Sequence, residues 1–206
     1  YRMRSASDVR SGQTNALVFS TFAFTVCFAV WTIFSIIGVQ IKSDLGLTET
    51  QFGLLIGTPI LTGSLVRLIL GIWSDKYGGR IVYVAVMLSA AVATWLLTFA
   101  YDFRTFVLAA LGVGIAGGSF AVGVAYVSNW YAPDRQGTAL GIFGAGNVGA
   151  AVTKFVAPFV MVMYGWKTVA DVWAIALVIT AGVFWVCTRD DPKTAERRLR
   201  GVAPRS

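Results

Sequence analysis

The stretch FGLLIGTPILTGSLVRLILGIW, residues Phe52 to Trp73, is an apolar run that contains a single arginine, Arg67, and no acidic residue. A helix needs about 20 mostly apolar residues to cross the hydrocarbon core of a bilayer, so this run is long enough to span it. An isolated guanidinium inside a span costs about 2.5 to 3.5 kcal/mol on insertion scales. Because arginine does not deprotonate in proteins, Arg67 needs a carboxylate partner, a water-filled cavity or an anionic ligand.

Further apolar runs of membrane-spanning length lie on both sides of this stretch. The chain is 56% hydrophobic and only 13% charged, which is outside the composition of a soluble domain. Short linkers with turn or charge signals separate the runs, so no soluble domain fits between them. We therefore predict an all-α membrane protein with six transmembrane helices, at Ala16–Val39, Phe52–Trp73, Ile81–Ala100, Phe106–Trp130, Thr138–Met163 and Val169–Cys187.

The basic residues predict the orientation, because Lys and Arg are enriched in cytoplasmic loops. Of the 17 basic residues, Arg67 and Lys154 fall inside spans, and only Lys42, Arg104 and Lys167 fall on the side opposite the two termini. Both termini are therefore predicted to be cytoplasmic. Topology also explains the net charge of +7, so no nucleic-acid partner is expected. The chain divides into a cytoplasmic N-terminal segment, a bundle and a cytoplasmic linker or tail, at residues 1–15, 16–187 and 188–206.

Arg67 has no acidic partner in a neighbouring span. The 10 acidic residues lie in loops or tails, except for Asp171 near the outer end of the sixth span, and the chain has no histidine. A proton relay of buried carboxylates or imidazoles therefore has no evident members. A guanidinium in a cavity attracts anions, and its planar fork donates two parallel hydrogen bonds to an oxyanion. Taken alone, Arg67 fits anion binding and snorkelling to the inner headgroups equally well.

Depth favours the anion site. Counted from the cytoplasmic helix ends, Arg67, Phe120 and Asn147 each lie on the order of 10 to 15 Å inside the membrane. Three helices thus offer a cation, an aromatic face and an amide at one level.

Glycines and a second cation surround Asn147. Gly144 and Gly146 leave room for a ligand, although close helix packing is the interpretation that we favour for glycines in these spans. Lys154 lies two turns beyond Asn147 on the same helix face. It fits a relay for the anion, a counter-charge for Asp171 or a snorkelling residue, and the sequence does not rank these roles.

The sequence predicts neither an enzyme nor a cofactor. Residues 112–117 and 144–149 match the dinucleotide pattern G-x-G-x-x-G, but both lie in the middle of membrane-length apolar runs and not between a strand and a helix. Neither a nucleophile and base pair nor a metal-ligand cluster is found, and Cys27 and Cys187 match no metal or redox spacing. Trp31 lies well inside the first span, and we expect it to pack.

The loop GIWSDKYGGR, residues 71–80, matches G-x3-D-[RK]-x-G-x-[RK] and resembles a motif of the major facilitator superfamily. With six spans and cytoplasmic termini, the chain resembles one half of such a transporter. The resemblance implies that the loop locks the cytoplasmic helix ends together, through charge and helix-dipole contacts of Asp75 and Arg80. It assigns gating to Gly71, Asp75, Gly79 and Arg80.

Within that superfamily, the chain resembles the nitrate/nitrite porter family over nearly all of its length. Arg67 matches an arginine of the second span, residues 114–120 match a pattern of the fourth span, and GIFGAGNVG, residues 141–149, matches the glycine-rich signature of the fifth. By this resemblance Arg67 would bind the anion, Phe120 would stack on its planar face and Asn147 would hydrogen-bond it. The residues so assigned to the substrate are Arg67, Phe120, Asn147, Gly144 and Gly146, while Lys154 occupies a position where a neutral polar residue is expected.

The resemblance implies transport of nitrate and nitrite by alternating access, as nitrate/nitrite antiport or nitrate/proton symport, in the cell membrane of a bacterium. Family members have twelve spans, so a second six-helix half, membrane lipids and the two anions are the expected partners. Two alternatives remain open. One is a major facilitator carrier for another small anion, and the other is a six-span protein that forms an oligomeric anion channel or acts as a sensor.

Overall fold

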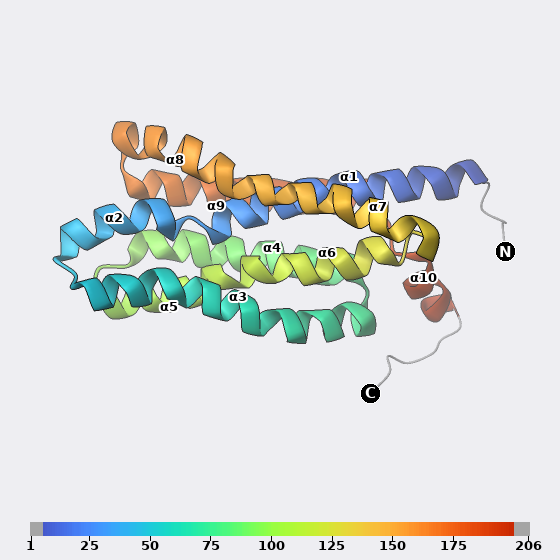
Figure 1. The fold of residues 1–206 in the computed structure, drawn as a ribbon, viewed down its shortest axis with the longest axis horizontal. Coiled ribbons are helices and arrows are strands. Elements are labelled where there is room, and N and C mark those ends of the chain that lie inside the picture. Colours follow the sequence, from blue (N-terminus) through green and yellow to red (C-terminus); the bar gives the residue numbers. More distant parts are fainter. Residues whose placement is uncertain (1–5, 200–206) are drawn as a thin grey trace.

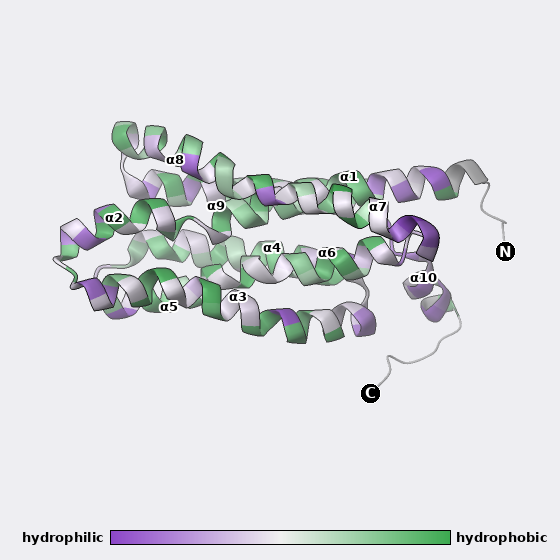
Figure 2. Ribbon diagram, in the orientation of Figure 1, coloured by the Kyte–Doolittle hydropathy of each residue, from purple (hydrophilic) through white to green (hydrophobic). Residues whose placement is uncertain are grey.

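The computed structural model describes residues 6–199, and every regular element in this range is a helix. Six helical stretches of the described chain are long and apolar enough to cross a membrane, which confirms the predicted fold class. They lie side by side in an elongated bundle (Figure 1), whose apolar middle separates two more hydrophilic ends (Figure 2). The spans are formed by α1 (Ala6–Trp31) and α2 (Phe34–Leu45); α3 (Glu49–Tyr77); α4 (Gly79–Leu96) and η1 (Leu97–Phe99); α5 (Phe103–Val113), η2 (Gly114–Gly118) and α6 (Ser119–Ser128); α7 (Pro133–Gly144), η3 (Ala145–Val148) and α8 (Gly149–Tyr164); and α9 (Trp166–Cys187).

The first span is interrupted, whereas the sequence predicted one helix over Ala16–Val39. Between α1 and α2 the chain makes a tight turn, in which the N–H of Ile33 bonds the carbonyl of Val30 at 3.0 Å. The hydroxyl of Thr32 donates to the carbonyl of Phe28 at 3.0 Å. Such back-bonding competes with the helical ladder, which gives a local reason for the break.

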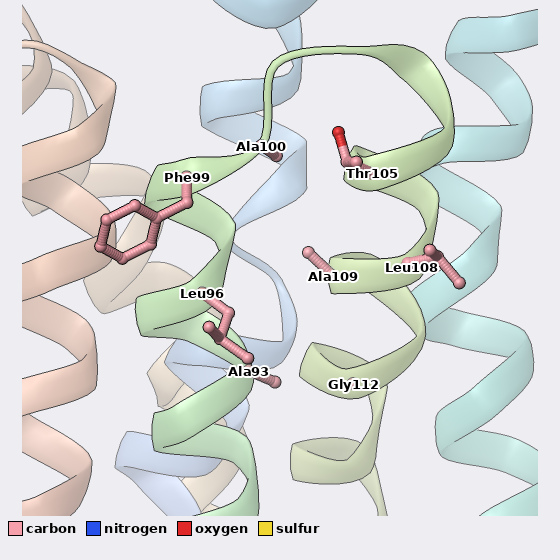
Figure 3. Close-up of a pocket in the computed structure, with 8 residues that line it drawn as sticks. All are labelled: Ala93, Leu96, Phe99, Ala100, Thr105, Leu108, Ala109 and Gly112. Atoms are coloured by element: carbon pink, nitrogen blue, oxygen red, sulfur yellow. The ribbon is translucent and has the colours of Figure 1, made fainter.

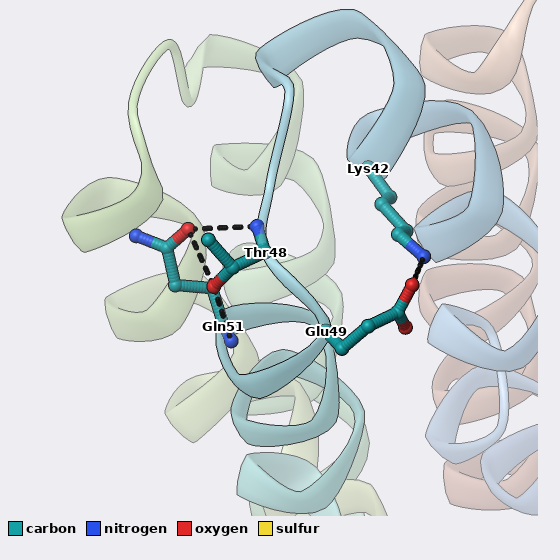
Figure 4. A network of polar contacts seen from close by, with 4 residues as sticks. All are labelled: Lys42, Thr48, Glu49 and Gln51. Atoms are coloured by element: carbon teal, nitrogen blue, oxygen red, sulfur yellow. Dashed lines mark hydrogen bonds and ion pairs between the residues drawn. The ribbon is translucent and has the colours of Figure 1, made fainter.

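The connection between α2 and α3 is stabilised by a glycine cap at the end of α2 and by a capping box at the start of α3, the second of which is drawn in Figure 4. Gly46 ends α2 in the left-handed conformation at φ 60°, which a glycine adopts without steric penalty. Thr48 begins α3 with a capping box: its hydroxyl accepts from the N–H of Gln51 at 3.3 Å, and the Gln51 side chain accepts from the N–H of Thr48 at 3.0 Å. Lys42 and Glu49 add an ion pair of 2.6 Å across the turn.

Beyond the sixth span, a short helix, α10 (Pro192–Leu199), packs at one end of the bundle. Asp191 caps it, because its carboxylate accepts from the N–H of Thr194 at 3.0 Å and from the Thr194 hydroxyl at 2.7 Å. The chain is therefore not helical between the end of α9 at Cys187 and the start of α10 at Pro192. Figure 1 shows α10 at the same end as the start of α1, and we call this the α10 end. Its cytoplasmic orientation stays a prediction from the basic residues.

Buried polar contacts join α1 to its neighbours across the core. The Tyr83 hydroxyl of α4 donates to the carbonyl of Ser20 at 3.1 Å. The Thr153 hydroxyl of α8 donates to the carbonyl of Ala29 at 2.6 Å and accepts from the indole N–H of Trp173 in α9 at 2.9 Å. Because lipid offers no alternative partners, such bonds fix how the spans face one another.

Candidate anion-binding site

Arg67 lies on α3, and its side chain is held against the fourth span. The guanidinium Nε donates to the carbonyl oxygen of Gly117, in η2, at 3.0 Å. Within residues 6–199, no other hydrogen bond and no ion pair of this guanidinium is found. The side chain is half-buried, and the two terminal nitrogens, Nη1 and Nη2, are its remaining donors. These two nitrogens form a fork that matches two oxygens of a planar anion.

Two aromatic rings lie beside the guanidinium. Its carbon, Cζ, is 5.3 Å from the ring centroid of Trp31 and 5.8 Å from that of Phe120. Both distances are within the range of cation–π attraction, which extends to about 6 Å. The structure therefore brings together two of the predicted site residues, Arg67 and Phe120, and adds Trp31 to them.

The two rings belong to a connected set that we call the aromatic wall: Trp31, Phe28, Phe24, Phe143 and Phe120. Ring centroids are 5.2 Å apart for Trp31 and Phe28, and 5.4 Å apart for Phe28 and Phe24. Phe24 stacks on Phe143 at 4.9 Å and contacts Phe120 at 5.4 Å. Phe24 and Phe143 are buried, whereas Phe120 is 37% exposed, so Phe120 is accessible to a ligand. Three spans contribute to this wall.

The backbone is irregular in the spans that surround Arg67. The first span breaks after Trp31, and the fourth and fifth pass through the 3₁₀ segments η2 and η3. Phe120 lies just after η2, and Asn147 lies within η3. Glycines weaken the α-helix at both segments. Inside a membrane, irregular backbone is tolerated only where protein buries it or where it lines a cavity, and a 3₁₀ stretch within a helix often marks a functional hinge or a strained sequence.

The glycines of the fifth span have different surroundings. A Cβ added to Gly144 would meet nothing within 4 Å. At Gly146 it would lie 2.4 Å from a ring carbon of Phe24, and at Gly149 it would lie 2.0 Å from the carbonyl oxygen of Thr25. Close packing therefore accounts for glycine at 146 and 149, and Gly144 alone of these three is open to a ligand.

Asn147 and Lys154 are both exposed. The Asn147 amide nitrogen donates to the carbonyl of Gly144 at 2.8 Å, one turn earlier in its own span. Among the described residues, no hydrogen bond joins Asn147 to Arg67, and no ion pair joins Lys154 to Asp171. The roles predicted for Asn147 and Lys154 therefore stay predictions.

The charged residues of the 71–80 loop lie at the α10 end. Arg80 stacks on the ring of Trp185, with its Cζ 4.0 Å from the ring centroid, and donates to the Trp185 carbonyl in the last turn of α9. A cation at a helix C-terminus is favourable. The carbonyl of Asp75 accepts a hydrogen bond from Arg197 of α10. Among the described side chains, the carboxylate of Asp75 forms no ion pair with Arg80.

Glycines let the elements of this end approach one another. Gly79 begins α4 against α6, where an added Cβ would lie 2.6 Å from the Cβ of Tyr126. Gly78 has φ 96°, and its added Cβ would lie 2.7 Å from a side-chain carbon of Thr194. Gly71 has open space around it. The loop thus joins α4, α6 and α10, while nothing in its contacts explains a glycine at 71.

Two surface grooves between spans lie apart from Arg67. The larger, of about 850 Å³ between α4 and α9, contains one charged residue, Asp171. The smaller has a volume of about 390 Å³ and no charged lining residue (Figure 3), so it has no cation to attract an anion. Its lining residues are Ala93, Leu96, Phe99, Ala100, Thr105, Leu108, Ala109 and Gly112. Within the described chain, no group of three or more His, Cys, Asp or Glu residues is placed to hold a metal ion.

Sequence reasoning missed most of the aromatic wall. Trp31 was expected only to pack, and Phe24, Phe28 and Phe143 were not singled out. A signal was present, because Phe24, Phe28 and Trp31 follow the i, i+4, i+7 spacing of one helix face. That spacing predicts a shared face, but it does not predict that Arg67 of another span meets it.

Known proteins resemble this chain in sequence and in fold. The family model described as Major Facilitator Superfamily matches residues 19–205. The chain belongs to the major facilitator superfamily. A bacterial homologue of the human lysosomal transporter Spinster, in an inward-facing conformation, superposes with a TM-score of 0.76 at 20% identity, over 87% of this chain and 44% of that one. This similarity shows the fold alone.

Curated relatives within the superfamily carry more specific names. A probable nitrate/nitrite antiporter NarK1 of Thermus thermophilus is 39% identical over 92% of this chain and 46% of its own length. A probable nitrate/nitrite transporter NarK2 of Mycobacterium tuberculosis is 35% identical over 88% of this chain and 47% of its own length. The chain therefore spans about half the length of the curated relatives it matches, and it is a multi-pass membrane protein like other members of the superfamily. The predicted resemblance to nitrate/nitrite porters is confirmed.

Proposed function

We propose that this chain supplies one half of a nitrate/nitrite transporter that works by alternating access, with Arg67 as its anion-binding residue. The observation that carries the proposal is the geometry of that arginine. Its Nε is engaged by Gly117, and its two terminal nitrogens remain as a fork beside Phe120. The names of the relatives support nitrate and nitrite as the anions.

Nitrate suits this site physically. It is planar and monovalent, so two of its oxygens match the two terminal nitrogens of Arg67 in one plane. Phe120 is 37% exposed, so part of its ring is available to contact such an anion. The amide nitrogen of Asn147 carries two hydrogens and uses one for Gly144, so it retains a donor for the anion. Gly144, whose carbonyl accepts from Asn147, has open space beside its Cα, and Gly146 would shape the same segment through its contact with the aromatic wall.

The proposed site is half of a site, completed by a second six-helix half. For each span we compare the share of an apolar 18-residue stretch that the rest of the chain buries. This share is only 22% in α3 and in the fifth span, against 44–50% in the other four spans. These two spans carry Arg67 and Asn147, so both hydrogen-bond donors proposed for the anion lie on the spans with the most surface left to cover, whereas Phe120 lies on a span that is half buried. Substrate sites between two related halves are the arrangement in such transporters, and rocking of the halves about the site gives alternating access.

The 71–80 loop is proposed to act in gating and not in binding. Arg80 ties the start of α4 to the end of α9, and Asp75 is tied to α10. Gly71 and Gly79 belong to the same motif, and Gly79 permits the close approach of α4 to α6. Lys154, exposed on α8, is proposed to line the path of the anion.

Uptake of labelled nitrate into liposomes that contain the complete protein tests this function. We expect uptake that saturates with nitrate concentration and that is faster into nitrite-loaded than into empty liposomes. Stimulation of uptake into empty liposomes by an inward proton gradient would instead identify nitrate/proton symport. Nitrate uptake that does not saturate with concentration would contradict the proposal. So would uptake of chloride and formate at the same rate as nitrate, which would favour a carrier or channel for other anions.

A further inference from the structure

The indole of Trp31 occupies a slot between two spans that only glycines allow. A Cβ added to Gly63 of α3 would lie 2.8 Å from the indole Nε1, and one added to Gly117 of η2 would lie 2.6 Å from the ring carbon Cε2. Real Cβ atoms essentially never make such contacts. The ring is therefore wedged between the second and fourth spans, at the point where the first span breaks.

A hydrogen bond fixes the direction of this ring. The indole Nε1 donates to the carbonyl oxygen of Pro59 at 2.8 Å. Pro59, Gly63 and Arg67 follow one another at intervals of four residues, so they lie along one side of α3. Side chains of a helix lean toward its N-terminus, which carries Arg67 back over the turn that contains Gly63 and onto the indole.

Trp31 and Gly117 together determine where the guanidinium lies. Its Cζ is 5.3 Å from the indole centroid, and its Nε donates to the carbonyl of Gly117. The indole and Arg67 thus both contact Gly117 of η2. Fixing one end of an arginine in this way leaves its terminal nitrogens in a defined direction, which is the preorganisation that an ion site needs.

We propose that Trp31 is a positioning residue for anion binding: its indole, held by Pro59, Gly63 and Gly117, keeps the Arg67 guanidinium oriented for the anion. This inference rests on the proposed function, because it assumes that Arg67 binds nitrate. It gives Trp31 a role in affinity, whereas a ring that only fills space would affect folding alone. The two roles predict different kinetics.

The test compares two tryptophan variants in the complete protein. Trp31→Phe keeps an aromatic ring but loses the N–H that bonds Pro59. Trp173→Phe loses a matched indole bond, 2.9 Å long, to the hydroxyl of Thr153 in the core. For each variant, KM and kcat for nitrate uptake into nitrite-loaded liposomes are measured and normalised to folded protein, and thermal stability is measured beside them.

Loss of one hydrogen bond that orients the cation is expected to raise KM for Trp31→Phe about five- to tenfold, with kcat within about twofold of wild type. Trp173→Phe is expected to lower thermal stability and leave KM unchanged. A KM for Trp31→Phe within about twofold of wild type would overturn the proposal, as would an equal rise in KM for Trp173→Phe.

A second variant covers the case in which Trp31→Phe does not fold. Gly117→Ala keeps the indole N–H but pushes the ring, and it is expected to raise KM in the same range; a folded Gly117→Ala protein with wild-type KM would refute the positioning role. Failure of the proposed function gives a different result, because wild-type protein would then show no saturable nitrate uptake at all.

Discussion

Gly149→Ala tests whether the glycine-rich fifth span serves helix packing. The added Cβ would lie 2.0 Å from the carbonyl oxygen of Thr25 and 2.9 Å from the backbone nitrogen of Ala29. Ordinary contact begins near 3.4 Å, so α8 and α1 would have to separate by about 1.4 Å. Because the obstacle is backbone on both sides, no rotamer change relieves it. Overpacking of this kind costs about 3 kcal/mol or more.

The same separation would stretch a neighbouring bond. One turn further along α8, the Thr153 hydroxyl donates to the carbonyl of Ala29 at 2.6 Å, and its loss adds about 1 kcal/mol. We therefore expect Gly149→Ala to lower the free energy of unfolding of the complete protein by about 4 kcal/mol. The loss would be seen as a lower midpoint temperature of thermal unfolding in detergent.

Gly144→Ala is the matched control for this prediction. Its Cβ meets nothing within 4 Å, and alanine is the better helix former, so the unfolding midpoint should stay the same or rise by the equivalent of up to about 1 kcal/mol. A Gly149→Ala protein that unfolds at the wild-type temperature would refute the packing argument, and so would equal destabilisation by the two substitutions.

Two further substitutions test contacts at the α10 end and in the core. Arg80→Gln removes the cation from the face of Trp185 and from the C-terminal end of α9. We expect the free energy of unfolding to fall by about 1 to 2 kcal/mol, seen as a lower unfolding midpoint. An unchanged midpoint would contradict the view that Arg80 holds the helix ends together. Thr153→Val leaves the indole N–H of Trp173 buried without its partner, which should cost about 1 to 3 kcal/mol in the same assay, and Thr153→Ser, which keeps the hydroxyl, should recover most of that stability.

The sequence was sufficient to predict the six spans and to single out Arg67 as an unpaired charge within one of them. Span length and hydropathy are local properties, and the lack of an acidic partner for Arg67 follows from where the carboxylates fall along the chain. The structure adds that the Arg67 side chain bonds Gly117 of the fourth span, a contact between residues that lie 50 positions apart. Hydropathy alone left that point open, because snorkelling and binding have the same residue pattern.

The aromatic wall and the breaks in the spans were beyond the sequence patterns for a physical reason. Whether Trp31 meets Arg67 depends on the rotation of two helices about their axes, and an apolar run carries little information about rotation when lipid and core are equally apolar. The contrast among glycines has the same origin. Gly144 and Gly146 belong to one motif, yet only Gly146 faces Phe24, because residues two positions apart point to nearly opposite sides of a helix.

Uptake of nitrate by an Arg67→Lys protein tests most directly whether this arginine binds the anion. Lysine keeps the positive charge but has no Nε to bond Gly117 and no fork for two anion oxygens. Charge-assisted hydrogen bonds contribute about 1.5 to 3 kcal/mol each, so KM for uptake into nitrite-loaded liposomes should rise at least about tenfold. Arg135→Lys is the matched control. Arg135 forms an exposed ion pair with Asp134, with its Nε 3.8 Å from the carboxylate, and this substitution should leave KM unchanged. An Arg67→Lys protein that takes up nitrate with the wild-type KM would contradict the assignment of the anion to this arginine.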